Sequence, residues 1–124
     1  MKIYLAAPYA EMALMRWWKT LIEGDEHKCT ARWLTGNPNE PWGPATHAQN
    51  DLDDIDASDA VISMVLPPTQ PVVRGSRHVE FGYALGIGKR LFVIGAQENI
   101  FHYLPSVHSV NTWEEAVTYL LEKK

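Results

Sequence analysis

Short apolar runs alternate along the chain with longer segments in which apolar residues recur every three or four positions. A short apolar run bounded by turn residues is typical of a buried strand, whereas the wider spacing is typical of a helix with one apolar face. The expected strands are residues 3–7, 27–33, 59–66, 91–95 and 107–110. The expected helices are residues 9–23, 45–58, 76–86 and a last helix opened by Thr112, with 97–104 as a short helix or a structured loop.

The first helix and two helix starts carry the most detailed local signals. Five apolar residues are expected to form the buried face of helix 9–23: Leu14, Trp17, Trp18, Leu21 and Ile22. We expect Ser76 to be the N-cap of helix 76–86, because a serine hydroxyl can accept a hydrogen bond from a free N–H group of the first turn. Thr112 followed by Glu115 has the spacing of a capping box, which predicts the start of the last helix.

The alternation of strands and helices predicts an α/β fold. We expect a flavodoxin/Rossmann-like three-layer sandwich, with helices on both faces of a five-stranded parallel sheet and a single domain over residues 1–124. In such folds, ligands bind beyond the carboxyl ends of the strands, where the strand order switches. The segments after the first, third and fourth strands are therefore the first places to look for a site.

Composition and charge restrict the possible partners. The chain has 124 residues, of which 46% are hydrophobic and 21% charged, and its formal net charge is −4. Nucleic acid polymers need a basic face, so a small-molecule ligand is the better match. No apolar run approaches the roughly 20 residues of a membrane span, and we find no signal peptide. Because the chain has one cysteine, Cys29, we expect a reducing compartment and a cytoplasmic protein.

Glu80 is the first candidate for chemistry. It lies near the start of helix 76–86, among apolar residues. The helix dipole favours a carboxylate there by about 0.3–1 kcal/mol, so we expect Glu80 to stay ionised, as a nucleophile must. Gly75, just before the helix, would let the backbone approach a ligand closely. An ordinary surface glutamate near a helix start is an equally good interpretation of the spacing.

Asp51 and Tyr4 are two further candidates. Asp51 lies on the same face of its helix as His47, four residues earlier. The other acids of this helix are expected to form a solvated face: Asp53, Asp54 and Asp56. Tyr4 lies in a buried strand, where its hydroxyl needs a partner that a neighbouring carboxylate would supply. A core tyrosine bonded to the backbone is the simpler alternative.

Several other kinds of chemistry have little support. The five histidines show no spacing typical of a metal site with a supporting cysteine or carboxylate, so we expect no metal. Ser76 is not in a nucleophile elbow, which argues against acyl transfer. The glycines from Gly75 to Gly88 follow the third strand and lack the spacing of a phosphate-binding loop. We therefore expect no cofactor.

Three segments together resemble the nucleoside 2-deoxyribosyltransferase family, which includes related nucleoside and nucleotide N-glycoside hydrolases. The first is the strand Ile3-Tyr4-Leu5. The second is Asn50-Asp51-Leu52, followed by Asp59 at the start of a strand. The third is Glu80-Phe81-Gly82-Tyr83-Ala84-Leu85, followed by Gly88-Lys89. The resemblance covers nearly the whole chain in the same order.

The resemblance implies a role for each candidate. Glu80 would attack the anomeric carbon of the sugar, and Tyr4 would orient Glu80. Asp51 would bind the sugar and assist proton transfer at the leaving base, with His47 as a support. The family also implies a homodimer or a higher oligomer, in which Asn99 reaches the sugar in a neighbouring subunit.

The resemblance also suggests which residues contact the substrate. The candidates follow the strand ends or lie on the two central helices: Pro8, Tyr9, Trp42, His47, Arg74, Gly75, Ser76 and Asn99. Trp42 or Trp33 would stack on the base, although a structural role is the simpler interpretation of both.

Two departures from the family pattern leave the substrate open. Arg74 stands where the transferases often have a base-reading aspartate, so base preference is not predicted. Residues 7–10 lack the serine and arginine with which the nucleotide hydrolases hold a 5'-phosphate, which favours a free nucleoside. Against this, the positive charge and donors of Arg74, Ser76, Arg77 and His78 would suit a phosphate.

The sequence thus leads to one main hypothesis and two rivals. The main hypothesis is an enzyme that cleaves the N-glycosidic bond of a 2'-deoxynucleoside through a glycosyl-Glu80 intermediate and transfers the sugar to another base or to water. The first rival is a hydrolase of nucleoside 5'-monophosphates. The second is a non-catalytic nucleotide-sensing module on the same fold, which would have no need to keep Tyr4, Asp51 and Glu80 together.

Overall fold

The computed structural model describes residues 1–35, 43–65 and 75–122 of the chain. The strands are β1 (Lys2–Ala6), β2 (Lys28–Cys29), β3 (Ala60–Met64), β4 (Arg90–Ile94) and β5 (Val107–Val110). The α-helices are α1 (Met12–Gly24), α2 (Pro44–Asp56), α3 (Ser76–Gly86) and α4 (Trp113–Glu122). Three short 3₁₀ helices are η1 (Tyr9–Glu11), η2 (Arg32–Leu34) and η3 (Ile100–Tyr103).

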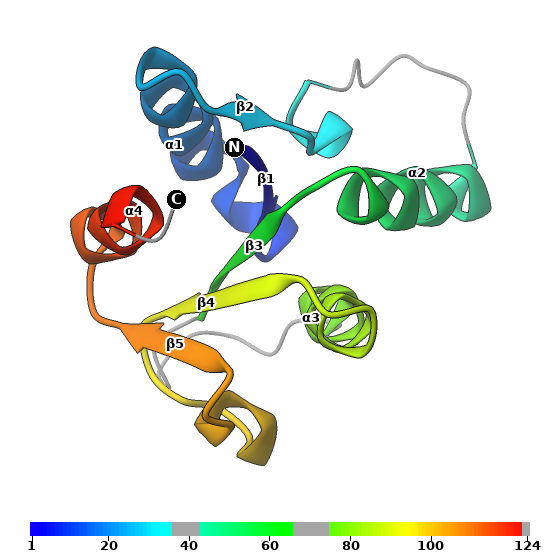
Figure 1. The fold of residues 1–124 in the computed structure, drawn as a ribbon. Coiled ribbons are helices and arrows are strands. Elements are labelled where there is room, and N and C mark those ends of the chain that lie inside the picture. Colours follow the sequence, from blue (N-terminus) through cyan, green and yellow to red (C-terminus); the bar gives the residue numbers. More distant parts are fainter. Residues whose placement is uncertain (36–42, 66–74, 123–124) are drawn as a thin grey trace.

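The strands form one parallel sheet in the order β2-β1-β3-β4-β5. Helices α1 and α4 cover one face of this sheet, and α2 and α3 cover the other (Figure 1). The expected α/β three-layer sandwich with a five-stranded parallel sheet is therefore confirmed. Strand order switches between β1 and β3, and this is where open parallel sheets bind ligands.

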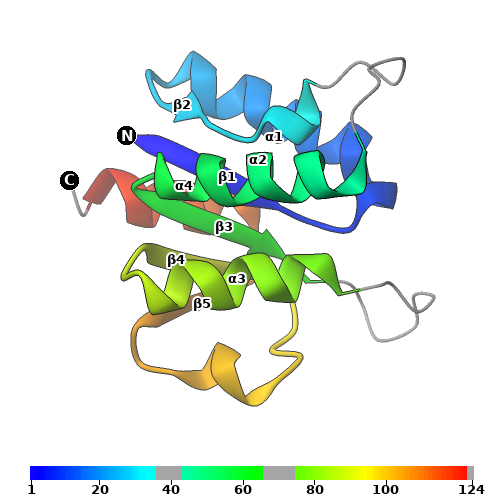
Figure 2. The same cartoon turned by 90° about the vertical axis from the view of Figure 1, so that its right-hand side faces the viewer.

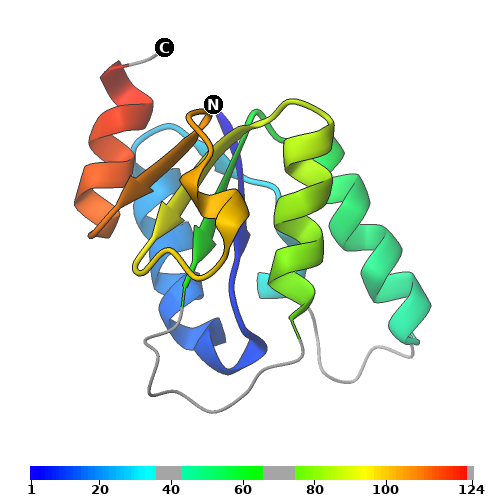
Figure 3. The ribbon, with the colours of Figure 1, turned by 90° about the horizontal axis from the view of Figure 1, so that it is seen from below.

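Helices α2 and α3 lie side by side along their face of the sheet (Figures 2 and 3). Helix α3 packs against β1, β3 and β4, whereas α2 packs against α3 and η2. This layer carries the residues that the sequence singles out for chemistry.

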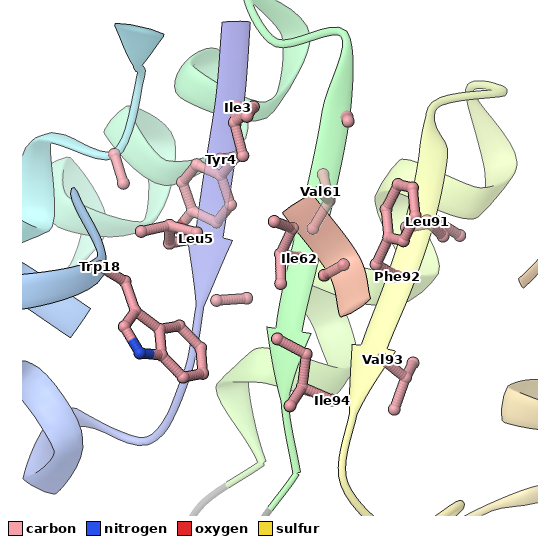
Figure 4. Packing of buried hydrophobic residues seen from close by; sticks show 14 of the residues in the cluster. Ile3, Tyr4, Leu5, Trp18, Val61, Ile62, Leu91, Phe92, Val93 and Ile94 are labelled. Carbon is pink, nitrogen blue, oxygen red and sulfur yellow. The ribbon is translucent and has the colours of Figure 1, made fainter. Parts of the chain in front are cut away.

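The core fills both sides of the sheet (Figure 4). Side chains alternate between the two faces along each strand, and residues in register share a face. Phe92 contacts Tyr119 of α4, so Ile62, its register partner in β3, points to the α1 and α4 side. On this side, Trp18 stacks on Trp113 at 4.6 Å between ring centroids. Leu5 of β1 is the register partner of Ile62. Tyr4 precedes Leu5, so its side chain points to the opposite face, toward α2 and α3.

The edge strand β2 is shorter than predicted. Only Lys28 and Cys29 pair with β1, and the chain turns into η2 where the strand was expected to continue to residue 33. The indole N–H of Trp33 donates a hydrogen bond of 2.9 Å to the carbonyl of Leu5. The apolar residues after Cys29 thus cap the end of β1 rather than extend the sheet.

The buried face of α1 is narrower than predicted. Met15, Trp18 and Ile22 are buried, whereas Leu14 and Trp17 are 37% and 59% exposed. The contact stripe follows positions i, i+3 and i+7, and the two exposed residues lie beside it. None of the described helices has both the length and the apolar character to span a membrane.

The two predicted helix starts have different outcomes. The N-cap of α3 is Gly75, in the left-handed region at φ 83°, and Ser76 is the first helical residue. The prediction of Ser76 as N-cap was wrong by one residue, because glycine adopts this conformation without strain. At α4, the backbone N–H of Glu115 donates to the Thr112 hydroxyl at 3.2 Å, as the capping pattern predicts.

Candidate active site

Tyr4, Asp51 and Glu80 come together from three separate elements. Tyr4 is in the middle of β1, Asp51 is the eighth residue of α2, and Glu80 is the fifth residue of α3. The charges of Glu80 and Asp51 both raise the pKa of the Tyr4 hydroxyl, and the charge of Asp51 raises the pKa of Glu80. The three side chains therefore share one polar environment between the sheet and the two helices.

The Tyr4 side chain has no solvent exposure. Its hydroxyl forms no hydrogen bond of standard length and angle within the described part of the chain. It is nevertheless close enough to Glu80 for hydrogen bonding to lower the pKa of that carboxyl. Burial, followed by the two nearby carboxylates, raises the pKa of Tyr4 well above its ordinary range, so the hydroxyl remains a donor. Buried hydroxyls normally have a hydrogen-bond partner. The Tyr4 O–H can therefore still donate a hydrogen bond at the place where the two carboxyl groups meet.

Glu80 is half-buried, and its surroundings make it a weak acid. Burial and the charge of Asp51 raise the pKa of Glu80 to about 8, against a smaller lowering by the Tyr4 hydroxyl. Burial therefore opposes the expectation that Glu80 stays ionised. The helix dipole acts mainly within the first turn, and Glu80 lies beyond it, so burial dominates.

Asp51 is also half-buried and titrates at a lower pH than Glu80. Burial, followed by the charge of Asp54, raises the pKa of Asp51 to about 6, while His47 and Arg32 lower it. His47 is exposed and lies one turn before Asp51 on α2, as the spacing predicts. His47 thus favours the ionised form of Asp51.

Glu80 and Asp51 behave as a pair that holds one proton over a range of pH. With pKa values of about 8 and about 6, the pair carries a single proton between these two pH values. Two carboxyl groups whose pKa values are pushed apart can act as one acid and one base. The arrangement is therefore suited to a reaction that needs a carboxylate and a carboxylic acid at once.

Asp54 does not lie on a solvated face, contrary to expectation. It is 6% exposed, whereas Asp53 and Asp56 are exposed as predicted. Asp54, Ile55 and Ser58 follow Asp51 at helical spacing, and all three are buried. This stripe was a sequence signal that Asp54 shares the inward face.

The other substrate-binding candidates lie around the carboxyl ends of the strands. Pro8 is buried as the N-cap of η1, and Tyr9 after it is 75% exposed. Gly75 and Ser76 lead into α3, and Ser76 is exposed. The candidates Trp42 and Arg74 lie outside the described residues.

A second polar cluster lies at the start of α3 and was missed in the sequence. One terminal nitrogen of Arg77 lies within hydrogen-bond distance of both carboxylate oxygens of Glu98, the longer contact being 2.8 Å. Nε2 of His78 is 2.9 Å from Glu98, and the backbone N–H of Glu98 donates to Nδ1 of His102. Arg77 is 4% exposed and His102 1%. Arg77 and His78 were among the residues expected near a phosphate. Both instead contact the carboxylate of Glu98.

Asn99 begins the exposed segment that follows this cluster. Its side-chain oxygen accepts a hydrogen bond of 3.0 Å from the backbone N–H of Phe101, which makes it the N-cap of η3. Ile100, Phe101 and Tyr103 beside it are 78%, 54% and 65% exposed. No group of three or more potential metal ligands occurs within residues 1–35, 43–65 and 75–122.

Two solved structures have a similar fold. One is a CMP N-glycosidase from Clostridium botulinum, BcmB, with 22% sequence identity, a TM-score of 0.67, and coverage of 98% of this chain and 99% of the other. The second is a 2-desoxiribosyltransferase from Leishmania mexicana, with 19% identity, a TM-score of 0.76, and coverage of 98% and 97%. No family model matches the sequence, and no curated protein matches it either. At these identities, the similarity establishes the fold.

Proposed function

We propose that the protein cleaves the N-glycosidic bond of a 2'-deoxynucleoside and transfers the sugar from Glu80 to another base or to water. The observation that carries this proposal is that Glu80 of α3 and Asp51 of α2 come together next to the Tyr4 hydroxyl of β1. The two solved structures with this fold are named as an N-glycosidase and a desoxiribosyltransferase, and these names support the same class of reaction.

In the proposed reaction, a Glu80 oxygen attacks C1' of the sugar as the bond between C1' and the base nitrogen breaks. The electron pair of that bond moves to the base, which takes a proton from Asp51. The acceptor, a second base or water, then attacks C1', loses its proton to Asp51, and releases Glu80 as a carboxylate. Two carboxyl groups divide the work of retaining glycosidases in the same way.

The proton of the pair has to lie on Asp51 when Glu80 attacks. In the free protein it lies mainly on Glu80, whose pKa is the higher of the two. Positive charge develops at C1' in an oxocarbenium-like transition state, and it favours the ionised form of the facing Glu80. The Tyr4 hydroxyl favours the same form, because hydrogen bonding to a carboxylate lowers its pKa. Tyr4 is therefore assigned as the residue that orients Glu80 and stabilises its charge.

Residues at the strand ends are proposed to hold the rest of the substrate. Pro8 and Tyr9 after β1, and Gly75 and Ser76 before α3, flank the edge of the sheet at which ligands bind in this fold. Asn99 is proposed to reach the sugar of a neighbouring subunit in a homodimer or larger oligomer. The exposed apolar side chains next to it, on η3, are consistent with a surface that another subunit covers.

A nucleoside 5'-monophosphate is the second candidate substrate. The neighbour named as a CMP N-glycosidase favours it. The engagement of Arg77 and His78 by Glu98 favours a free nucleoside instead, because neither side chain is left to neutralise a phosphate. Comparing base release from a deoxynucleoside and from its 5'-monophosphate distinguishes the two candidates.

The experiment that tests the proposal is an incubation of the protein with each 2'-deoxynucleoside, with and without a second free base. Chromatography of the products detects base release, which indicates hydrolysis, or a new nucleoside, which indicates transfer. Glu80→Gln should abolish both, because an amide cannot form the glycosyl ester.

Glu114→Gln is the matched control, since Glu114 is an exposed glutamate on α4 outside the proposed site. Full activity of Glu80→Gln, or equal losses in the two variants, would refute the assignment of Glu80. A protein that releases no base from any deoxynucleoside or monophosphate would favour the non-catalytic nucleotide-sensing module.

A further inference from the structure

Asp54 and Arg32 form a clamp directly beside Asp51. The backbone N–H of Arg32 donates to one Asp54 oxygen at 2.9 Å, and the Arg32 Nε donates to the other at 2.8 Å. The Arg32 Nη2 also donates to the carbonyl of Asn50 at 3.4 Å. Thr30 adds a bond of 2.8 Å from its hydroxyl to the Asp54 carbonyl. The segment from Thr30 to Arg32 thus holds α2 on both sides of Asp51.

The clamp differs from an ordinary surface ion pair. The Asp54 side chain is only 9% exposed and is fixed by donors on both oxygens, while the Arg32 side chain is 49% exposed. Asp51 and Asp54 are three residues apart and therefore lie on one face of the helix. A fixed negative charge next to a half-buried carboxyl group makes that group harder to ionise.

Charged groups on α2 and η2 act on Asp51. On α2, Asp54 raises the pKa of Asp51 and His47 lowers it. On η2, Arg32 lowers the pKa of Asp51, so the two members of the clamp act in opposite directions. Glu80 on α3 and Tyr4 on β1 complete the group, and Asp51 acts on both of them.

We propose that Asp54 and Arg32 are a positioning pair for Asp51, and that this pair holds the turn of α2 that carries Asp51 against η2. The same pair sets how readily Asp51 keeps its proton. The inference rests on the function proposed above, in which Asp51 is the proton donor. Neither residue touches the substrate. Their effect on the reaction passes through the place and the charge of Asp51.

Opposite substitutions in the clamp should move the titration of Asp51 in opposite directions. Asp54→Asn removes the negative charge, so the pKa of Asp51 should fall by about half a unit or more. Arg32→Gln removes the positive charge but keeps its backbone N–H, so the pKa of Asp51 should rise. Arg32→Lys keeps the charge, so Asp51 should titrate close to the wild-type pH.

The measurement is the carboxyl ¹³C shift of Asp51 as a function of pH, assigned by its loss in Asp51→Asn. Asp53→Asn is the matched control, because Asp53 immediately precedes Asp54, is exposed, and its side chain accepts a hydrogen bond from exposed Gln49 rather than from the clamp. Opposite displacements in the two clamp variants, with none in the control, support the proposal. Displacements in the same direction, or none, overturn it.

A second readout separates this inference from the proposed function. The lower limb of the pH dependence of kcat/KM for base release should shift with the Asp51 titration in each variant. If the wild-type protein releases no base, the proposed function fails, but the NMR titration still tests the clamp. If Asp54→Asn does not fold, Arg32→Gln and Arg32→Lys decide the outcome alone, because Arg32 is half exposed and its removal leaves no buried gap.

Discussion

Replacing Glu80 with glutamine should make the protein more stable, and increasingly so as the pH rises. The folded chain holds the Glu80 proton up to about pH 8, whereas an unperturbed glutamate releases it at 4.5. Between these values the folded state binds more protons than the unfolded state, so wild-type stability falls as the pH rises. Below pH 4.5 this contribution is fully present, and above pH 8 it is lost. A neutral glutamine has no such dependence.

The magnitude follows from the two pKa values. Each pH unit within the window is worth about 1.4 kcal/mol, so the variant should gain about 3 kcal/mol at pH 7 and about 5 kcal/mol above pH 9. These are upper limits, because Glu80 is only half-buried and shares its titration with Asp51. A gain of even 1–2 kcal/mol at pH 9, about a third of the limit, is a large fraction of the stability of a small domain.

The assay is urea unfolding of wild type and Glu80→Gln at pH 5, 7 and 9. The difference between their free energies of unfolding should widen with pH, while Glu114→Gln should stay within about 0.5 kcal/mol of wild type throughout. A difference that is constant with pH would mean that Glu80 does not titrate near pH 8. The one-proton pair on which the proposed function depends would then be wrong.

Four further predictions follow from the same contacts. The pH profile of kcat/KM for base release should be bell-shaped, with limbs near pH 6 and pH 8. Asp51→Asn should lower kcat about 10²–10⁴-fold in the same assay. Tyr4→Phe should change the free energy of unfolding in urea by less than about 1 kcal/mol, because the lost hydroxyl has no complete hydrogen bond, yet it should reduce base release by raising the pKa of Glu80. Glu98→Gln should destabilise the protein by about 1–3 kcal/mol in urea, because it leaves the buried Arg77 without its counter-charge, and a loss below 1 kcal/mol would contradict the pairing.

The sheet could be predicted well because its signals are local. The apolar runs at β3 and β4 are short, continuous and bounded by turn residues, so their burial fixes both their type and their position. The predicted β2 was too long, because η2 contains apolar residues that would also suit a strand. Its side chains pack over the end of β1 instead of entering the sheet, and composition does not distinguish the two arrangements.

The candidate site was predicted only in part. Tyr4, Asp51 and Glu80 each had an ordinary structural alternative, and the resemblance to a known family was what joined them. The pairs Arg32–Asp54 and Arg77–Glu98 were missed, because their members are 22 and 21 residues apart and meet only when neighbouring elements pack together. The raised pKa of Glu80 was missed for the same reason, since it depends on burial that no local pattern encodes.

The three elements that supply Tyr4, Asp51 and Glu80 have a consequence for how the protein refolds. A partly folded chain that has formed only α3 and β4 carries Glu80 but neither Tyr4 nor Asp51. The proposed activity would return only after β1 has entered the sheet beside β3 and α2 has docked next to α3. Recovery of turnover after dilution from denaturant would therefore follow completion of the central sheet, and separated fragments of the chain would be inactive.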